Sequence, residues 1–407
     1  MTAFAPTPPT GPVVRVLHVN SMLIGGGTDD QCLKQVLGLH ERGQRVLLAG
    51  PADRALAVRA RELNLAVCDT GAEGPLKLGF ISRCARFIRE HDIQIIHGHH
   101  GRDLWPTILA ARLSGRRPRV VLTRHLAKSP SSWASRNFLL GQCDALVAVS
   151  EFTARVLREG VSEPDSPEPE RRHRRPLRGA HAKIVVIHGG LDTARFQPRP
   201  AEDPAVQSLR REWELEPAHM AFAVMGGYEL PRGKGQREFL LAAANLRAEL
   251  PAARFLMVGR GSLRETLERD IDRLGLRGRA QLAPWCADMP AAMNAIDCLV
   301  HPQVGTEAFG LVVCEAHACG RPVIASALDG IPEAFALGGQ GRLVAPESVP
   351  ELAAAMRAEA AAPRLDFAQR RALHERVHTR ASLAVLAENT LRLYHRLLQE
   401  SPSPRPA

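Results

Sequence analysis

The sequence predicts an α/β protein made of two doubly wound domains, and three observations indicate this architecture. Short apolar segments alternate with amphipathic segments along most of the chain. Glycine-rich turns follow several of the apolar segments, which is typical of parallel strand–helix units. A length of 407 residues is too great for one ordinary core, and a hydrophobic content of 45% is enough to fill two.

The first series of elements runs over residues 13–190. The segment VVRVLHVN at 13–20 predicts a strand, a glycine turn follows it, and the next segment carries apolar residues at helical spacing until Gly43. Further strands are predicted at 44–50, 93–100, 119–125, 144–150 and 182–190. Residues 161–181 combine Pro, Ser and clustered charge, so they predict a flexible surface loop.

A second series occupies residues 191–375. The segments 220–227 and 253–261 predict strands that end in glycine turns, and 262–276 predicts a helix with one apolar face. The segments AIDCLVHP, GLVVCEAHACG and RPVIAS then predict a strand, a helix and a strand, and residues 376–400 contain a long amphipathic helix. Ligands of doubly wound sheets bind beyond the carboxyl ends of the strands, so two such halves predict a cleft between them.

The ends of the chain and its cysteines favour a cytoplasmic protein. The Pro/Thr-rich residues 1–12 predict a disordered tail rather than a signal peptide, and residues 401–407 predict a second tail. No apolar run approaches the roughly 18 residues of a membrane helix. The eight cysteines are scattered without a C-x-x-C pair, which favours buried free thiols in a reducing compartment.

The net charge of +10 restricts the partners without selecting one. The excess is mostly Arg and includes a dense cluster at 171–178. Nucleic acid fits the sign of the charge, but aromatic residues make up only 4% of the chain and offer few platforms for base stacking. An anionic small substrate or the anionic inner face of a membrane explains the sign equally well.

The segment EAFGLVVCE, residues 307–315, places two carboxylates beside a predicted helix start. Glu307 lies in the loop before the helix, and Glu315 lies about a turn and a half inside it. Unpaired amides at a helix start favour an anion such as a diphosphate. The amides concerned are those of Phe309, Gly310 and Leu311. Carboxylates beside an anion make sense when they accept hydrogen bonds from hydroxyl groups, so this segment predicts a sugar nucleotide site.

The same segment carries a resemblance to a known family. EAFGLVVCE, followed by AHACGRPVIASALDGIPE, resembles the E-x7-E signature of the retaining, family 4 type glycosyltransferases of group 1, which have the GT-B fold. Other matching segments occur in the same order and spacing: IGGG, IIHGHH, LTRH, VAVSEFTARVL, IHGGLDTARFQP, GKGQREFL, LMVGRG and MPAAMNAIDCLVHP. The resemblance covers roughly residues 13 to 400.

The resemblance implies a fold and a division of labour between the two halves. It implies two Rossmann-like domains that face a cleft, with 13–190 as the acceptor domain and 191–375 as the nucleotide-sugar domain. It also implies that the helix within 376–400 packs back on the first domain. The activity implied is transfer of a hexose-like sugar from a nucleotide-diphosphate-sugar to a hydroxyl group, with retention and without a metal or other cofactor.

The resemblance also implies roles for particular residues. Glu315 would bind the ribose hydroxyls, Glu307 would act as a catalytic residue against the donor sugar, and Lys234 would neutralise the leaving diphosphate. His125 would act on the sugar or the acceptor, with His99 nearby. Further donor contacts are expected from Gly26, Gly27, Gly259, Gly261, Pro284 and Trp285, besides the three amides of the helix start.

One departure from the family pattern concerns the loop GGYELPRGKG. The family usually has an Arg shortly after the strand glycine, where this chain has Tyr228 or Glu229. Arg232, two residues before Lys234, is the candidate that would supply the missing positive charge to the diphosphate.

The expected partners follow from the same resemblance. They are the nucleotide-sugar donor and a glycan or lipid-linked acceptor of lipopolysaccharide or other surface-glycan synthesis, with peripheral contact to the anionic inner membrane and no nucleic acid. The alternative is a nucleotide-sugar 2-epimerase of the same fold, which would convert the donor alone. A basic nucleic-acid-binding protein is a third hypothesis.

Two further patterns resemble metal sites, but neither predicts one. The histidines of HGHH have no further ligand at a fixed spacing on the same element. The D-x-D pattern at 270–272 places Ile271 on the apolar face of a helix, so Asp270 and Asp272 are expected to point to water.

Overall fold

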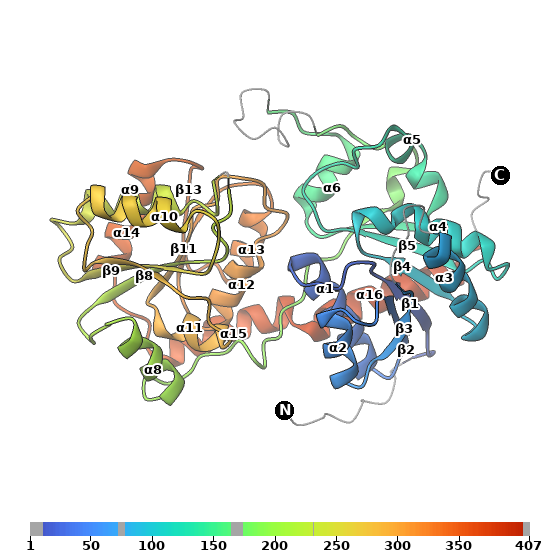
Figure 1. Ribbon diagram of the computed structural model, residues 1–407, viewed down its shortest axis with the longest axis horizontal. Coiled ribbons are helices and arrows are strands. Elements are labelled where there is room, and N and C mark those ends of the chain that lie inside the picture. The colour runs from blue at the N-terminus through green and yellow to red at the C-terminus, as the bar shows by residue number, and fades with distance from the viewer. Residues whose placement is uncertain (1–10, 72–77, 164–173, 231, 402–407) are drawn as a thin grey trace. The chain divides into compact units, whose positions relative to one another are not determined.

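The computed structural model describes residues 11–71, 78–163, 174–230 and 232–401, and these form two compact units (Figure 1). Unit 1 comprises residues 1–190 together with 383–407, and unit 2 comprises residues 191–382. Most of the two predicted tails, residues 1–10 and 402–407, lies outside the described residues.

Unit 1 is built on a seven-stranded parallel sheet with the strand order β3-β2-β1-β4-β5-β6-β7. The strands are β1 Arg15–Val19, β2 Arg45–Gly50, β3 Ala66–Asp69, β4 Ile95–Gly98, β5 Arg119–Arg124, β6 Ala145–Ala148 and β7 Ile184–Val186. The central strands are buried on both faces, because helices cover the two sides of a parallel sheet. The chain order reverses between β1 and β4, so this pair marks the switch point where ligands of such sheets bind.

The helices of unit 1 come from both ends of the chain. They are α1 Gly27–Glu41, α2 Ala55–Glu62, α3 Leu78–Glu90, α4 Leu104–Leu113, α5 Trp133–Gln142, α6 Glu151–Arg158 and α16 Leu383–Gln399, with short 3₁₀ turns at Gly101–Asp103 and His181–Lys183. Helix α16 packs on α1, where Gln35 donates a 2.7 Å hydrogen bond to Thr390 and Ala387 is fully buried. The predicted return of the last helix to the first domain is confirmed.

Two predictions in unit 1 need correction. The returning helix begins at Leu383 and not at residue 376, because Ser382 adopts an extended conformation and residues 376–381 still belong to helix α15 of unit 2. The base of the predicted 161–181 loop is ordered. Val161 and Arg174 exchange two backbone hydrogen bonds, and the Arg174 guanidinium lies over the Phe152 ring. Residues 164–173 lie outside the described residues.

Unit 2 repeats the same design with a six-stranded parallel sheet ordered β10-β9-β8-β11-β12-β13. Its strands are β8 Met220–Met225, β9 Ala253–Val258, β10 Ala280–Ala283, β11 Cys298–His301, β12 Val323–Ser326 and β13 Gly341–Val344. Its helices are α8 Pro204–Glu212, α9 Gln236–Leu246, α10 Arg264–Arg273, α11 Met289–Ala295, α12 Leu311–Ala318, α13 Ile331–Gly338, α14 Val349–Ala361 and α15 Phe367–Ala381. The switch point lies between β8 and β11, so the loops after these strands meet.

The cysteines and the helix lengths bear on two further expectations. All eight cysteines are free, and seven of them are buried, as the sequence predicts. Among the described residues, no helix has both the length and the apolar character needed to cross a bilayer.

The packing of α16 on α1 predicts the effect of a substitution at Gly38. A Cβ atom on Gly38 would lie 3.0 Å from the Leu383 carbonyl oxygen and 3.2 Å from the Ala387 Cβ. We expect Gly38→Val to lower the free energy of unfolding of unit 1 by about 1–3 kcal/mol, because the added methyl groups overpack this contact. Urea unfolding monitored by circular dichroism measures the loss. Gly27→Ala at the exposed start of α1 is the control, since no atom lies within 4 Å of its added Cβ, and an equal loss there would contradict the prediction.

Candidate functional site

The candidate site of unit 2 is built by the two loops that follow β8 and β11. Lys234 in the first loop and Glu307 in the second form an ion pair, with 2.9 Å between Nζ and Oε2. The loops approach closely at Gly235, where φ is +85° and a Cβ atom would lie 1.9 Å from the Pro302 carbonyl oxygen. Only glycine fits this position, so the local sequence Lys-Gly sets the distance from the cation to the carboxylate.

The backbone around Glu307 is fixed on both sides. Its N–H donates to the Asp329 carboxylate at 3.2 Å, and its carbonyl oxygen accepts from the Gly330 amide at 3.1 Å. Burial raises the pKa of the Glu307 carboxyl, but Lys234, the neighbouring His301 and the amide of Phe309 together hold that pKa below its usual range. Glu307 is therefore a carboxylate at neutral pH, and one of the three amides predicted to face an anion contacts this carboxylate.

Helix α12 begins beside Glu307 without a capping side chain. Gly310 is its N-cap residue, with φ of +96°, and glycine has no side chain that could accept a hydrogen bond from the first turn. Leu311 opens the helix, and Glu315 lies one turn further on the same face, where it is partly exposed. The structure thus places Glu307 before the start of the helix and Glu315 on its first two turns, as the E-x7-E spacing predicts.

The glycines after β9 have a packing role that the sequence did not indicate. A Cβ atom on Gly259 would lie 2.2 Å from the Gly226 carbonyl oxygen, and one on Gly261 would lie 2.5 Å from the Tyr228 backbone. Tyr228 is buried and its hydroxyl donates to the Gly259 carbonyl oxygen at 3.0 Å. These two glycines therefore let the loops after β8 and β9 pack on one another.

Trp285 and its neighbours stand at the end of β10. The Trp285 ring is 56% exposed, and the Arg260 guanidinium lies 6.0 Å from its centre. Pro284 directly precedes it. An exposed indole held by a cation offers a flat apolar face, which suits the stacking of a planar ring.

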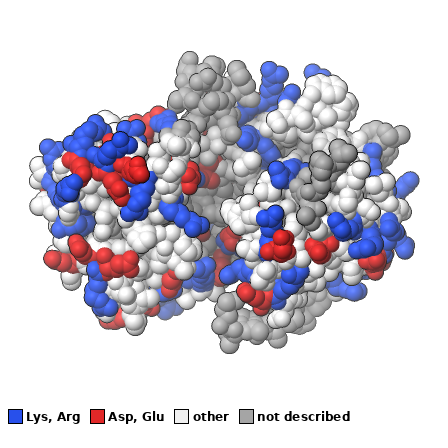
Figure 2. Space-filling model, viewed as in Figure 1, with Lys and Arg blue, Asp and Glu red and all other residues white. Residues whose placement is uncertain are grey.

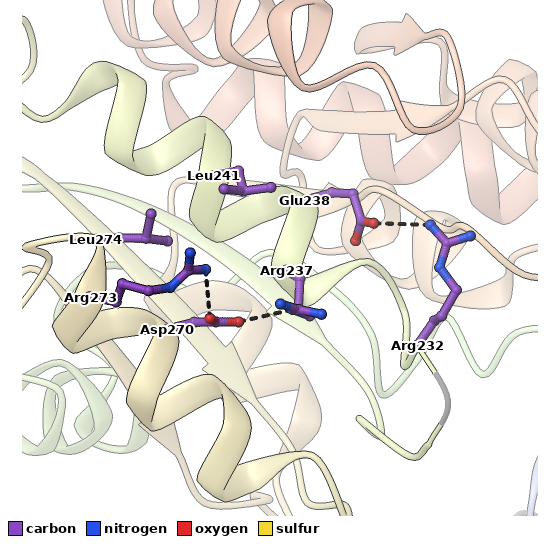
Figure 3. Close-up of a pocket in the computed structure, with 7 residues that line it drawn as sticks. All are labelled: Arg232, Arg237, Glu238, Leu241, Asp270, Arg273 and Leu274. Carbon is purple, nitrogen blue, oxygen red and sulfur yellow. Dashed lines mark hydrogen bonds and ion pairs between the residues drawn. The ribbon is translucent and has the colours of Figure 1, made fainter.

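The Arg232 side chain is already engaged in ion pairs within unit 2. Its guanidinium forms ion pairs with Glu238 at 3.1 Å and with Glu347 at 2.9 Å. It lines a shallow, charged cavity on α9 and α10 (Figure 3). Glu229, in the same loop, accepts from the Ser262 hydroxyl at 2.7 Å. A role of Arg232 at the diphosphate would require it to leave two carboxylates, and that role stays a prediction.

The same cavity corrects the expectation for the D-x-D pattern. Asp270 does not point to water but is buried, and it accepts hydrogen bonds from Arg237 and Arg273 at 2.9 Å each (Figure 3). Asp272 pairs with Arg277 at 2.6 Å. Helical spacing brings Arg273 to Asp270, and the neighbouring helix α9 brings Arg237. Asp272 is exposed, as expected, and its partner Arg277 lies after the end of α10.

His301 is a residue of this site that the sequence analysis missed. It ends β11, is 1% exposed, and neither ring nitrogen has a hydrogen-bond partner among the described residues. Burial lowers the pKa of His301 to about 4, while the opposing charges of Glu307 and Lys234 lie close enough to act on it. A neutral buried imidazole without a partner is costly, so its two nitrogens suit a ligand or water at this loop. The signal for His301 that the sequence offered was a polar residue at the end of an apolar strand segment.

In unit 1, Gly26 and Gly27 stand at the start of α1 after β1. Gly26 has φ of +107°, and added Cβ atoms on both residues would meet nothing within 4 Å, so the turn is open on that side. The buried Asp29 carboxylate accepts from the amides of Ile24 and Gly25 at 3.1 Å each. The loop is thus pre-formed by its own helix, with the glycine backbone accessible.

His125 and His99 occupy different depths at the same edge of unit 1. His125 follows β5 and is partly exposed, whereas His99 follows β4 and is 1% exposed. Their rings are joined by a 3.4 Å contact between His99 Nδ1 and His125 Nε2. Burial lowers the pKa of His125 to about 3, so its ring is neutral at neutral pH. Of these two rings, only that of His125 is partly exposed, and a ligand contact for either residue stays a prediction.

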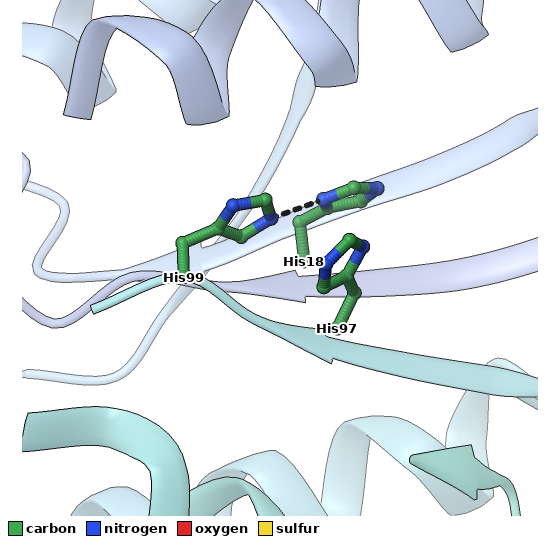
Figure 4. Close-up of side chains that lie close together, drawn as sticks. All are labelled: His18, His97 and His99. Atoms are coloured by element: carbon green, nitrogen blue, oxygen red, sulfur yellow. Dashed lines mark hydrogen bonds between the residues drawn. The ribbon is translucent and has the colours of Figure 1, made fainter. Parts of the chain in front are cut away.

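The structure brings His18, which lies outside the HGHH segment, to two of the histidines of that segment. His18 of β1 lies beside His97 and His99, and candidate ligand atoms of all three lie within 4.8 Å of one another (Figure 4). Strand pairing explains this arrangement, since His18 is the register partner of His97 in the adjacent parallel strand.

Lys and Arg side chains are spread over the visible surface among Asp and Glu (Figure 2). The positive charge seen from this side is therefore not gathered into one continuous patch.

Two family models match the chain. Residues 25–165 match Glycosyltransferase Family 4, and residues 221–360 match Glycosyl transferases group 1. The two matches lie in unit 1 and unit 2 and together cover most of the chain.

Similar proteins agree with these matches. A phosphatidyl-myo-inositol mannosyltransferase of Mycolicibacterium smegmatis is 26% identical over 91% of this chain and 90% of its own length. A D-inositol 3-phosphate glycosyltransferase of Mycobacterium marinum is 31% identical, over 43% of this chain and 36% of its own length.

Solved structures share the fold. A glycosyltransferase of Rickettsia africae superposes with a TM-score of 0.80 at 19% identity, over 96% of this chain and all of that one. Anabaena HepE, solved with UDP, superposes with a TM-score of 0.74 at 19% identity, over 94% of this chain and all of that one. With both halves matched by family models and both doubly wound units in place, the chain belongs to the family 4 type glycosyltransferases of group 1 and has the GT-B fold.

Proposed function

We propose that this glycosyltransferase moves a sugar from a nucleoside-diphosphate-sugar to a hydroxyl group, with retention at the anomeric carbon and without a metal. The observation that carries the proposal is the Lys234–Glu307 ion pair beside the uncapped start of α12, with Glu315 one turn further along. A cation, a helix start and two carboxylates suit a diphosphate flanked by two hydroxyl-bearing rings.

Each group has a chemical task in this reaction. As the bond from the anomeric carbon to the diphosphate oxygen breaks, Lys234 and the amides at the start of α12 stabilise the negative charge on the leaving group. Glu307 accepts hydrogen bonds from the sugar and supports positive charge near the anomeric carbon. The acceptor hydroxyl attacks from the face that the diphosphate leaves, and its proton passes to a diphosphate oxygen. The products are the glycoside and the nucleoside diphosphate.

The names of the similar proteins guide the choice of donor and acceptor. Relatives named for inositol-bearing acceptors favour a polyol hydroxyl, free or on a lipid, and they favour it over lipopolysaccharide. HepE was solved with UDP-glucose, so UDP-hexoses are the first donors to test. Surface glycan synthesis, the wider class predicted from the sequence, includes such acceptors.

A face of unit 1 supports peripheral contact with an anionic membrane. Helices α4 and α5 are joined by a 2.9 Å hydrogen bond from the Trp105 ring to Ser135. Together they expose large apolar side chains: Leu109 at 40%, Leu113 at 64%, Trp133 at 65% and Phe138 at 49%. Exposed arginines follow on α4 and at its end, namely Arg112, Arg116 and Arg117. Apolar groups beside basic ones suit an interface with anionic lipid.

The donor site predicts different effects for its two carboxylates. We expect Glu315→Gln to weaken binding of the nucleoside diphosphate about tenfold, since it loses charged hydrogen bonds to the ribose. We expect Glu307→Gln to lower kcat about a hundredfold while nucleotide affinity changes less than about threefold. Thermal-shift titration with UDP, GDP and ADP and their hexoses measures affinity, and product formation measures kcat. The exposed Glu265→Gln on α10 is the control, and equal behaviour of all three variants would refute the assignment.

The reaction type predicts a product that separates a transferase from a 2-epimerase. Incubation with donor alone should leave the sugar configuration unchanged, whereas addition of a polyol acceptor should yield a glycoside whose anomeric configuration matches the donor. Proton NMR of the products distinguishes these results, and excess chelator should leave the rate unchanged. Conversion of donor without acceptor would establish the epimerase instead. Inversion at the anomeric carbon would refute retention, and loss of activity with chelator would refute a reaction without a metal.

The apolar face of unit 1 predicts membrane binding that depends on lipid charge. We expect the chain to sediment with vesicles that contain phosphatidylglycerol and not with pure phosphatidylcholine vesicles. Replacing Trp133 and Phe138 by Ser should weaken the binding about tenfold, because two aromatic anchors are lost. Phe367→Ser, at an exposed aromatic residue of unit 2, is the matched control. Unchanged sedimentation of the double variant would rule out this face.

A further inference from the structure

The polar groups at the centre of unit 1 form one continuous hydrogen-bonded chain. It runs from the partly exposed edge of the sheet to helix α16 and back to strand β5. Its members, in order, are His125, His99, His18, Tyr394, His97 and Thr123. All except His125 are buried, with exposures of 0–4%.

The outer part of the chain joins three imidazole rings. His125 Nε2 lies 3.4 Å from His99 Nδ1, and His99 Nε2 lies 2.8 Å from His18 Nδ1. The rings of His99 and His18 are stacked with centres 5.0 Å apart. Figure 4 shows the His18–His99 contact from β1 to the segment after β4.

The inner part passes through the C-terminal helix. The Tyr394 hydroxyl lies 3.5 Å from His18 Nε2 and 2.6 Å from His97 Nδ1. His97 Nε2 then lies 2.6 Å from the Thr123 hydroxyl oxygen. Tyr394 is therefore the link by which α16 takes part in a network of the sheet.

A metal site is the competing explanation for this cluster. Three histidines in this proximity match a common ligand set. However, both ring nitrogens of His97 contact hydroxyl groups at 2.6 Å, and those of His18 and His99 are each directed to a partner within the chain. The group with candidate ligand atoms includes no carboxylate to offset the charge of a buried cation. The contacts favour a hydrogen-bonded chain.

The rings of the chain are neutral, and this couples their tautomers. Burial lowers the pKa of His18 to about 3 and the pKa values of His97 and His99 well below the usual value. A neutral imidazole carries a proton on one nitrogen and accepts on the other. Each ring therefore passes the direction of donation to the next, and the whole chain has only two self-consistent directions.

Thr123 selects one of these directions. Its hydroxyl is 4% exposed and has no second partner in the part of the chain that the structure describes. If His97 donated to it, the Thr123 hydroxyl proton would be buried without an acceptor, which is costly. If Thr123 donates to His97, then each following group donates in turn as far as His99, which donates to His125 Nε2. The proton of His125 is then on Nδ1.

We propose that this chain fixes His125 in the Nδ1-protonated form, so that the residue serves the reaction as a hydrogen-bond donor and not as a general base. The inference rests on the proposed function in one respect, namely that His125 contacts the sugar or the acceptor. His18, His99, His97, Thr123 and Tyr394 are then positioning residues for it.

The proposal bears on where the acceptor proton goes. An Nδ1–H group stabilises an oxygen that gains negative charge or carries a lone pair, but it cannot take up a proton. The proton of the acceptor hydroxyl must then pass to the leaving diphosphate, as the proposed retaining reaction requires. A neutral donor at this edge adds no charge to the site, which agrees with the burial of the rings behind it.

Nitrogen-15 NMR of the histidine rings in the full-length protein tests the chain directly. We expect the wild-type His125 ring, assigned by its loss in His125→Ala, to show a protonated Nδ1 and a bare Nε2. Tyr394→Phe and Thr123→Val should each yield a second set of His125 signals from the other tautomer. Thr390→Val is the matched control, since it removes a buried hydrogen bond one turn earlier on α16 without touching the chain. A protonated Nε2 in the wild type, or an unchanged spectrum in both chain variants, would overturn the proposal.

Kinetics separate the chain from the proposed function. We expect Tyr394→Phe and Thr123→Val to lower kcat about fivefold with the donor KM unchanged. Each variant removes about one hydrogen bond, whose free energy favours the Nδ1-protonated form of His125. His125→Asn, whose amide can donate near the position of Nδ1, should retain more activity than His125→Ala. Equal activity of these two variants would remove the donor role. Full activity of His125→Ala with an altered spectrum in Tyr394→Phe would place the failure in the contact with substrate and leave the chain intact. Stoichiometric zinc uptake that shifts the His18 and His97 signals would establish a metal site instead.

Discussion

The ion pair between Lys234 and Glu307 is the contact on which the candidate site of unit 2 depends. It joins two loops that follow adjacent strands at the switch point of a parallel sheet. Its geometry is set by packing, because Gly235 lies against the Pro302 carbonyl oxygen and allows no side chain. The pair leaves the carboxylate charged although it is largely buried, and it brings both charges to the start of α12.

The two units meet the demands of a sugar transfer with different physical means. Unit 2 presents charges and a helix start, which suit a diphosphate. Unit 1 presents neutral groups at the equivalent switch point, because its buried histidines have lowered pKa values. Polar groups without net charge can orient hydroxyls without competing for the diphosphate. Tyr394 of α16 enters this neutral network, so the return of the last helix completes the centre of unit 1 as well as its packing.

Much of the fold and part of the site could be predicted from local sequence. Glu307, Glu315 and Lys234 lie where motif spacing placed them, because each follows a strand or opens a helix with a clear apolar pattern. The buried state of Asp270 and the ion pairs of Arg232 could not be predicted, since each depends on a partner from another element. The strands β3, β10 and β13 were not predicted, because they lie at the edges of their sheets, are only partly buried and lack a continuous apolar run.

The sequence by itself determined the two α/β series, the glycine turns between them and the spacing of the E-x7-E residues, because these follow from periodicity and backbone preference along one stretch of chain. The tertiary structure alone decided which strands are neighbours. The pairing of β1 with β4 brings His18 beside His97, and the packing of α16 adds Tyr394 from the other end of the chain. Such contacts join residues far apart in sequence, so no local pattern encodes them, and the direction of the proton on His125 follows from them.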